Sequence, residues 1–159
     1  MSIFIAFDLE TTGLSSRDDT IIEYAFIKFD SHSFEIYETF SWFINPGIPI
    51  PPVVSELTWI KEEDVATAPT IDMLRSDIES FIAWYPLVWH NVDFDISFLK
   101  SAGISVQNNP TIDTFFLANS LCFRFPSLSL SSLCEYFSLS LPSAHRALDD
   151  TRATQQLFA

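Results

Sequence analysis

The sequence predicts an α/β fold in which helices cover a mixed sheet. Two observations lead to this prediction. Three apolar runs follow one another closely at the start of the chain, and apolar runs then alternate with helical patterns as far as its end. The first arrangement is typical of an antiparallel meander, and the second of strands joined by helices. At 159 residues the chain is long enough to form one domain with its own core.

The three opening runs have the composition of strands. Residues 3–7 are uniformly apolar, as expected of a central strand covered on both faces. Residues 21–29 are apolar apart from Glu23 and Lys28, and residues 34–44 show the alternation of a half-buried strand. We expect these runs to be the first three strands of a five-stranded sheet, each antiparallel to the next.

The remainder of the chain is expected to contain helices and two short strands. The proline-rich residues 45–52 form a loop, because proline lacks the N–H that a helix interior or an inner strand requires. The expected helices span residues 56–63, 71–84, 93–102, 114–121, 129–137 and 146–158. The short strands are expected at residues 87–89 and just before Asp113.

The composition argues against several classes of protein. No apolar stretch approaches the roughly 18 to 20 residues of a membrane-spanning helix, and the opening residues lack the basic flank of a signal peptide. We therefore expect a cytoplasmic protein that makes no contact with a membrane. Cys122 and Cys134 both lie in apolar surroundings, and two cysteines with three histidines do not suggest a disulfide framework or a zinc enzyme.

The charge restricts how the chain can bind a polyanion. Its net charge is −13, with only eight lysines and arginines, whereas nucleic-acid-binding proteins usually carry a basic surface. If the chain binds nucleic acid, we expect it to hold only a few nucleotides, close to bound cations.

Two carboxylates mark the end of the first expected strand. Asp8 and Glu10 are two residues apart, so their side chains point to the same face. Neighbouring carboxylates repel each other unless a cation or a proton lies between them, and hard divalent cations prefer such oxygen ligands. The segment that follows, Thr11-Thr12-Gly13-Leu14, offers backbone N–H groups and a glycine that permits close approach of a ligand. An ordinary turn at the end of a strand explains that segment equally well.

A second acidic segment follows the expected strand at residues 87–89. Asp93 and Asp95 both begin the next helix, which lies toward the sheet edge where ligands bind in α/β folds. Asp93 suits the N-cap of that helix, because its side chain can accept backbone N–H bonds there. We therefore prefer Asp95 as the candidate ligand.

The third segment contains His145 and Asp150. Residues five apart on a helix differ by about 140° around its axis, so both side chains share a site only if His145 precedes the helix. Imidazole gains and loses its proton near neutral pH and can act as a general base. A capping or surface role is the alternative for this histidine. Asp149 is expected to face solvent.

These three segments resemble the three motifs of the DEDDh exonucleases, in order and in separation. They read D-L-E-T-T-G from Asp8, H-N-x-x-F-D-x-x-F-L from His90 and H-R-A-L-D-D from His145. That family includes proofreading subunits of bacterial replicative DNA polymerases, ribonuclease T and oligoribonuclease, and it has a ribonuclease H-like fold. The resemblance extends from Ile3 to Phe158 and implies a single exonuclease domain over residues 1–159.

The resemblance also implies an activity and a catalytic site. The expected reaction is 3′→5′ hydrolysis of phosphodiester bonds at the end of a single strand, in DNA proofreading or repair, with nucleoside 5′-monophosphates released. Asp8, Glu10, Asp95 and Asp150 match the metal-binding acids, and His145 matches the catalytic histidine. Two divalent ions, Mg²⁺ or Mn²⁺, are expected, with Asp8 bridging them.

Further residues match positions around the family's site. Those expected to bind substrate are Thr11, Thr12, Gly13, Leu14, Asn91 and Phe98, and Phe94 and Asp113 are expected to support them. The family often has a His-Gly-Ile turn where this chain reads Leu57-Thr58-Trp59-Ile60. Trp59 then either packs in the protein, which we prefer, or stacks on a base.

Alternatives to this interpretation remain open. RNA is a possible substrate, because recognition of the 2′-hydroxyl depends on local contacts. A different class of function is a non-catalytic module that has the same fold and binds a protein partner. The phenylalanine-rich residues 115–141 are read mainly as core, with a homodimer or polymerase interface as the alternative.

Overall fold

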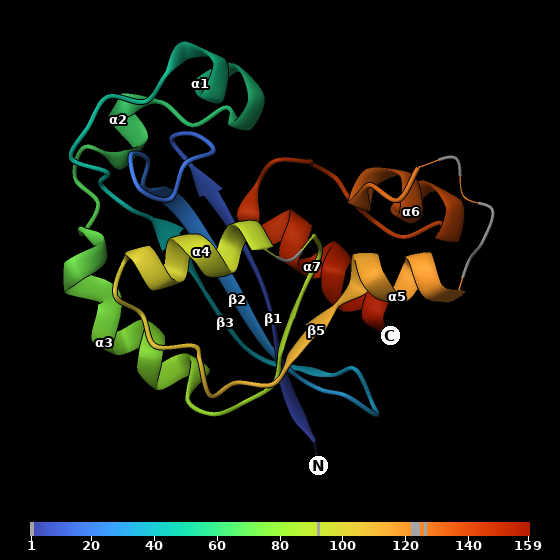
Figure 1. Ribbon diagram of the computed structural model, residues 1–159. Helices are drawn as coiled ribbons and strands as arrows, with labels where there is room; N and C mark the ends of the chain where they lie inside the picture. Colours follow the sequence, from blue (N-terminus) through green and yellow to red (C-terminus); the bar gives the residue numbers. More distant parts are fainter. Residues whose placement is uncertain (1, 92, 122–124, 126) are drawn as a thin grey trace.

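The computed structural model describes residues 2–91, 93–121, 125 and 127–159. Within these residues five strands form a mixed sheet with the order β3-β2-β1-β4-β5 (Figure 1). The strands are β1 (Ile3–Thr11), β2 (Ile21–Asp30), β3 (Ile36–Phe43), β4 (Leu87–Trp89) and β5 (Thr111–Asp113). The helices are α1 (Pro52–Thr58), α2 (Glu62–Val65), α3 (Ile71–Ile82), α4 (Asp93–Ser101), α5 (Thr114–Leu121), α6 (Leu130–Phe137) and α7 (Ala147–Phe158).

Strand β1 is antiparallel to its neighbour on one side and parallel to its neighbour on the other. β1 runs antiparallel to β2, and β2 runs antiparallel to β3, which confirms the predicted meander. On its other side β1 runs parallel to β4, and β4 runs parallel to β5. The carboxyl ends of β1, β4 and β5 therefore meet at one edge of the sheet, which is where ligands bind in α/β folds.

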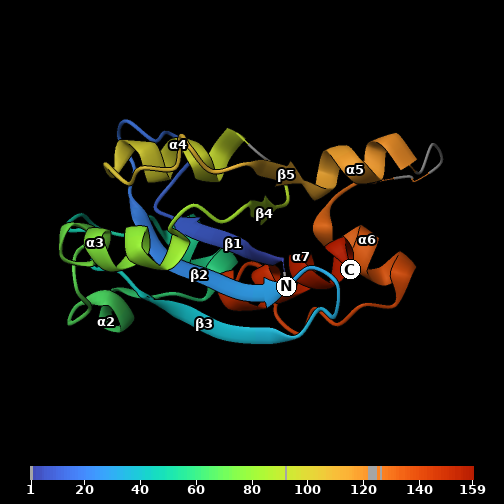
Figure 2. The same ribbon diagram turned by 90° about the horizontal axis from the view of Figure 1, so that it is seen from below.

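Both faces of the sheet are covered, as the apolar composition of β1 and β2 requires. Ile5, Phe7 and Leu9 point to one face and pack in a cluster with residues of α3 and α4, including Phe81 and Phe98. The other face packs against α7, and the two views show α3 and α4 on the opposite side of the sheet from α7 (Figures 1 and 2). This layering explains why β1 reads as an apolar run without alternation.

The helix predicted over residues 56–63 is wrong, because the chain forms two shorter helices there. α1 ends at Thr58, and Trp59 takes left-handed backbone angles with φ 62° and ψ 13°. A residue in this conformation ends an α-helix, since the next N–H no longer points along the helix axis. The preferred packing role of Trp59 is also wrong, because its side chain is 77% exposed.

Two other elements are shorter than expected for a similar reason. Phe34 has a φ of 59°, so the turn after β2 extends further and β3 begins at Ile36. Ala83 has a φ of 44° and ends α3 two residues before the predicted boundary. Positive φ angles are uncommon for residues other than glycine, so composition does not reveal these stops.

The phenylalanine-rich residues 115–141 divide between core and surface. Ala118, Leu133 and Cys134 are buried, as expected of core. Phe116 and Tyr136 are exposed, so the prediction of core holds for only part of this segment. Cys122 lies outside the described residues. In the described part of the chain, no helix has the length and apolar character needed to cross a membrane.

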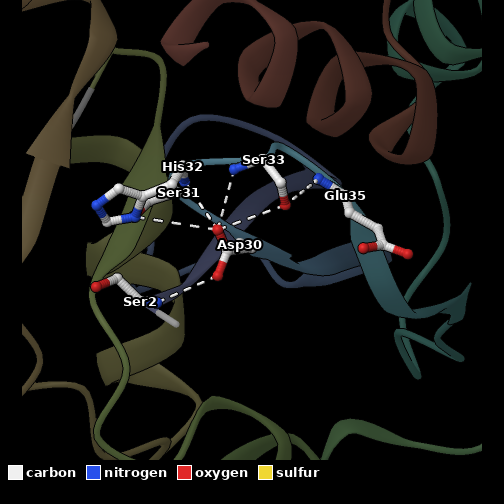
Figure 3. A network of polar contacts seen from close by, with 6 residues as sticks. All are labelled: Ser2, Asp30, Ser31, His32, Ser33 and Glu35. Carbon is white, nitrogen blue, oxygen red and sulfur yellow. Dashed lines mark hydrogen bonds and ion pairs between the residues drawn. The ribbon is translucent and has the colours of Figure 1, made fainter.

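Asp30 fastens the turn that follows β2, at the amino end of β1. Its carboxylate accepts the backbone N–H groups of Ser2 at 3.2 Å, His32 at 2.9 Å and Ser33 at 3.0 Å (Figure 3). The N–H groups of Ser33 and His32 lower the pKa of the Asp30 carboxyl, because they stabilise its charged form. One ionised side chain thus holds the start of β1, the end of β2 and the turn between β2 and β3.

Replacing Asp30 with asparagine is expected to lower the midpoint of thermal unfolding at pH 7. A carboxyl with a lowered pKa stabilises the folded state above its unfolded pKa, and this stabilisation is lost as the pH falls through the folded pKa. The difference between Asp30→Asn and the wild type should therefore shrink below about pH 4. The exposed Glu56→Gln provides a control. A difference that is the same at pH 3 and pH 7 would show that charge is not the cause.

Candidate active site

Asp8 and Glu10 project from the carboxyl half of β1. Their side chains lie on the face opposite Leu9, which packs in the core, so the alternation expected of a strand is confirmed. Both carboxylates are partly buried. The face on which they lie is the one covered by α7. The first turn of that helix carries Asp150.

Asp95 approaches the same place from α4. It is buried, and it lines the same cleft as Asp8, Leu9 and Glu10. Helix α4 thus places the third acid beside the first two. The competing residue Asp93 is the first residue of α4, and its side chain lies outside the described part of the structure.

Asp150 and His145 complete the cluster from the start of α7. His145 precedes the helix, as predicted, and its φ of 64° turns the chain sharply. Its backbone N–H donates to Oδ2 of Asp150 at 2.8 Å. Single ligand atoms of Glu10, His145 and Asp150 all lie within 4.8 Å of one another. Strand β1 and helix α7, far apart in sequence, therefore bring together a group of side chains that can hold a metal ion.

Burial and mutual repulsion raise the pKa of all four acids. Burial raises the pKa of Glu10 to about 8, with further increases from the charges of Asp150 and Glu23. Burial raises the pKa of Asp95 to about 7 and that of Asp150 to about 6, although a backbone N–H bond opposes each shift. The pKa of Asp8 is also well above its ordinary value, because of burial and the charges around it.

These raised pKa values show that the cluster is unfavourable when all its members are ionised and no cation is bound. A divalent cation supplies the missing positive charge, and carboxylate oxygen is the ligand that Mg²⁺ and Mn²⁺ prefer. The donor set therefore fits a hard divalent cation. Asp149, in contrast, is partly buried rather than facing solvent as predicted, and it does not line the site.

Glu23 and Arg146 form an ion pair beside the cluster of acids. The sequence did not predict this ion pair. Glu23 lies opposite Glu10 on β2 and is buried. Its two carboxylate oxygens accept Nη2 of Arg146 at 2.8 Å and Nε at 3.2 Å, and one of them also accepts the N–H of Ala147 at 3.0 Å. The pair thus fastens the start of α7, and with it His145 and Asp150, to β2. The sequence signal for it was a single acid in the apolar run of β2.

The cluster lies at the bottom of a cleft of about 560 Å³. One wall consists of the segment before and at the start of α6, where Ser127, Ser129 and Ser131 face the cleft. His90 supports this wall, since its ring nitrogens lie 2.9 Å from the Leu128 carbonyl oxygen and 2.9 Å from the Thr114 hydroxyl. Burial lowers the pKa of His90. The serine wall was not predicted, because nothing in its sequence links it to the acids.

Thr11 and Thr12, which are expected to bind substrate, form hydrogen bonds within the protein. The hydroxyl of Thr11 donates to the Gly13 carbonyl at 2.7 Å, and that of Thr12 donates to Asp19 at 3.1 Å. A Cβ atom on Gly13 would lie 2.4 Å from Oδ2 of Asp19. Glycine is therefore needed at position 13 because the Asp19 carboxylate lies against its backbone. The sequence had suggested a ligand in this space.

Leu14 and Asn91 lie at the mouth of the site. Leu14 is 88% exposed, and both residues line a hollow of about 700 Å³ together with Phe115 and Phe116. Asn91 also lines the cleft itself. Phe98 is only 2% exposed and packs against Phe94 with ring centroids 4.8 Å apart. Phe98 therefore lies in the core beneath Phe94, and its expected role in substrate binding stays a prediction.

Comparisons with known proteins agree with this geometry. The model of the RNase T exonuclease family matches residues 5–158. The chain is 38% identical to DNA polymerase III PolC-type of Caldanaerobacter subterraneus subsp. tengcongensis over 98% of its own length, but it spans only 11% of that protein. It is 36% identical to DNA polymerase III subunit epsilon of Treponema pallidum, over 98% of this chain and 74% of the subunit.

The fold also matches a solved structure. A zinc-bound complex of E. coli exonuclease I with single-stranded DNA superimposes with a TM-score of 0.82 and 20% identity, over 99% of this chain and 39% of that one. At this identity the likeness concerns the fold, and it confirms the ribonuclease H-like arrangement expected from the sequence.

Without a divalent cation, the folded protein should become less stable as the pH rises from about 4 to about 8. Over this range the raised pKa values of Glu10, Asp95 and Asp150 make the folded state hold protons that the unfolded state has released. In EDTA the midpoint of thermal unfolding should be lower at pH 8 than at pH 5.5. Mn²⁺ should raise it more at pH 8, because binding requires ionised ligands. An equal rise at both pH values would contradict this account.

Replacing Arg146 with methionine should lower the free energy of unfolding by about 1–3 kcal/mol, because it leaves the buried Glu23 carboxylate without its partner. Glu23→Gln in the same chain should restore part of the loss, since the amide oxygen still accepts the N–H of Ala147. Denaturant titration of the two single variants and the double variant measures this coupling. Arg152→Met, at an exposed position on α7, is the matched control. Additive losses would show that the pair is not a unit.

Proposed function

The chain belongs to the exonuclease family, and we propose that it is a metal-dependent 3′→5′ exonuclease acting on single-stranded DNA. The observation that carries this proposal is the convergence of Asp8, Glu10, Asp95 and Asp150 with His145 at one edge of the sheet. These residues come from β1, α4 and the start of α7. No requirement of folding explains four clustered acids whose pKa values are all raised.

Two divalent cations, Mg²⁺ or Mn²⁺, fit the acids as the cofactors of this reaction. Asp8, Glu10, Asp95 and Asp150 would hold them through carboxylate oxygens. When bound, the cations supply Lewis acidity and lower the pKa of water near the phosphate. They also neutralise part of the charge that makes this site repel a phosphodiester.

The protein's own groups orient the substrate and move the proton. His145 is exposed to the cleft, and a neutral ring nitrogen can accept a proton from the attacking water. As the new bond from water oxygen to phosphorus forms, the bond from phosphorus to the 3′ oxygen breaks, and that oxygen takes a proton from solvent. The products are a nucleoside 5′-monophosphate and a strand one residue shorter that again ends in a 3′-hydroxyl.

The preference for DNA and for a role in proofreading rests on the relatives. Both are named as parts of DNA polymerase III, and this chain is more than 35% identical to each. We propose that it acts with a polymerase, removing a mispaired 3′ residue that has frayed from its template. The cleft in which the terminal residue would lie has a volume of about 560 Å³.

Incubating the protein with 5′-labelled DNA and RNA strands of the same sequence, in Mn²⁺, tests the activity. The DNA should shorten in steps from its 3′ end, and EDTA should stop the reaction. Faster shortening of RNA would replace the DNA assignment by an exoribonuclease. No shortening of either strand by a folded protein that binds cations would favour a non-catalytic module.

Variants of the acids and of His145 test the roles within the site. His145→Ala should lower kcat by about 10²- to 10⁴-fold, the usual contribution of a general base. Asp8→Asn should lower it further, because the Asp8 carboxylate interacts with the charges of all three other acids. Asp149→Asn is the matched control, since this neighbouring acid does not line the cleft, and its effect should stay within a few fold. Equal losses in Asp8→Asn and Asp149→Asn would refute the assignment.

A further inference from the structure

Trp59 is a large aromatic side chain that the fold does not use. The indole is 77% exposed, although tryptophan is among the side chains that gain most from burial. Its backbone has φ 62° and ψ 13°, a left-handed conformation that glycine adopts freely and bulky residues rarely adopt. Neither the side chain nor the backbone therefore gives a structural reason for tryptophan at this position.

The residues on either side hold Trp59 firmly in place. Thr58 and Ile60 are both buried, at 1% exposure. The Thr58 hydroxyl donates to the Val54 carbonyl at 2.9 Å and accepts the N–H of Ile60 at 3.1 Å. The N–H of Trp59 itself donates to the carbonyl of Ser55 at 2.9 Å. The indole therefore projects from a fixed turn, and little conformational entropy is lost from the backbone when a ligand binds to it.

Packing places the turn that carries Trp59 near the residue that follows His145. Its neighbour Ile60 packs in a cluster that includes Phe43, and the guanidinium of Arg146 lies 5.5 Å from the Phe43 ring. Arg146 directly follows His145 in the sequence. Figure 1 shows α1, which Trp59 follows, beyond the carboxyl end of β1, where Asp8 and Glu10 lie.

The charge of the protein explains why an aromatic contact matters. The chain has 21 acidic residues against eight lysines and arginines. Of the seven that the structure describes, four pair with carboxylates: Lys28, Lys61, Arg75 and Arg146. Attraction to phosphates is thus weak, and the binding of a strand needs another source of free energy. Stacking of bases on aromatic rings provides it without basic residues and without sequence preference.

We propose that Trp59 stacks on a base of the single strand outside the cleft and so supplies binding that phosphate contacts do not. This inference rests on the proposed function, because it concerns the same strand whose 3′ end enters the site. It assigns Trp59 as a residue for binding longer strands, separate from the acids that act on the terminal phosphodiester.

Trp84 provides a matched control for this assignment. Its side chain is 76% exposed, almost the same as Trp59. It precedes β4, and the next residues approach the start of β1, since the N–H of Ile5 donates to the Pro86 carbonyl at 2.9 Å. Trp84 therefore lies at the amino edge of the parallel strands, away from the active-site edge.

Binding is measured in the Asp8→Asn protein, which is not expected to degrade the strand, with a fluorescent DNA dodecamer and Mn²⁺. Trp59→Ala and Trp59→Gly should each raise Kd by about 5- to 150-fold, and Trp59→Phe by less, because a smaller ring retains some stacking. Trp84→Ala should leave Kd unchanged. In the active protein, Trp59→Ala should raise KM for the dodecamer more than for a dinucleotide, with the smaller change in kcat.

Trp59→Gly shows whether a loss of binding is caused by unfolding, because this variant is expected to keep its fold. Glycine adopts the φ of 62° without strain, so its midpoint of thermal unfolding should be no lower than that of the wild type. If the wild type shortens strands while both Trp59 variants bind the dodecamer as tightly as their parent, this inference is overturned and the proposed function stands. If the wild type neither shortens nor binds the dodecamer, both are overturned.

Discussion

The repulsion among four carboxylates is the constraint on which the rest of this structure depends. Asp8 and Glu10 lie on one strand, and Asp95 and Asp150 reach them from two helices. Such a cluster would push its members apart unless the surrounding elements held them. The ion pair of Glu23 with Arg146 does so at the start of α7, and Asp95 is held by its burial on α4. The protein thus maintains an unfavourable arrangement that a bound cation makes favourable.

Much of this arrangement could be predicted from the sequence, because it follows from local periodicity. The two-residue period of a strand placed Asp8 and Glu10 on one face, and the five-residue separation required His145 to precede the last helix. The serine wall and Glu23–Arg146 could not be predicted in the same way. Their partners lie far away in the sequence, and no local pattern encodes a contact between β2 and α7.

The positions of Trp59 and Phe98 could not be predicted, for a common physical reason. The helix expected over residues 56–63 is interrupted because Trp59 takes a left-handed conformation, which side-chain composition does not reveal. Phe98 belongs to a motif with a role in the site, yet burial assigns it to the core. Neither the backbone conformation of Trp59 nor the burial of Phe98 follows from the local pattern of hydrophobic residues. Only the packed layers decide them.

The left-handed turn at Trp59 has a consequence for how this sequence changes over generations. Random substitution at this codon toward glycine would relieve backbone strain and leave the fold intact. The fold by itself therefore gives no reason to keep tryptophan at this position. Its persistence in descendants would measure natural selection on substrate capture, and its loss would mark lineages in which that selection has ended.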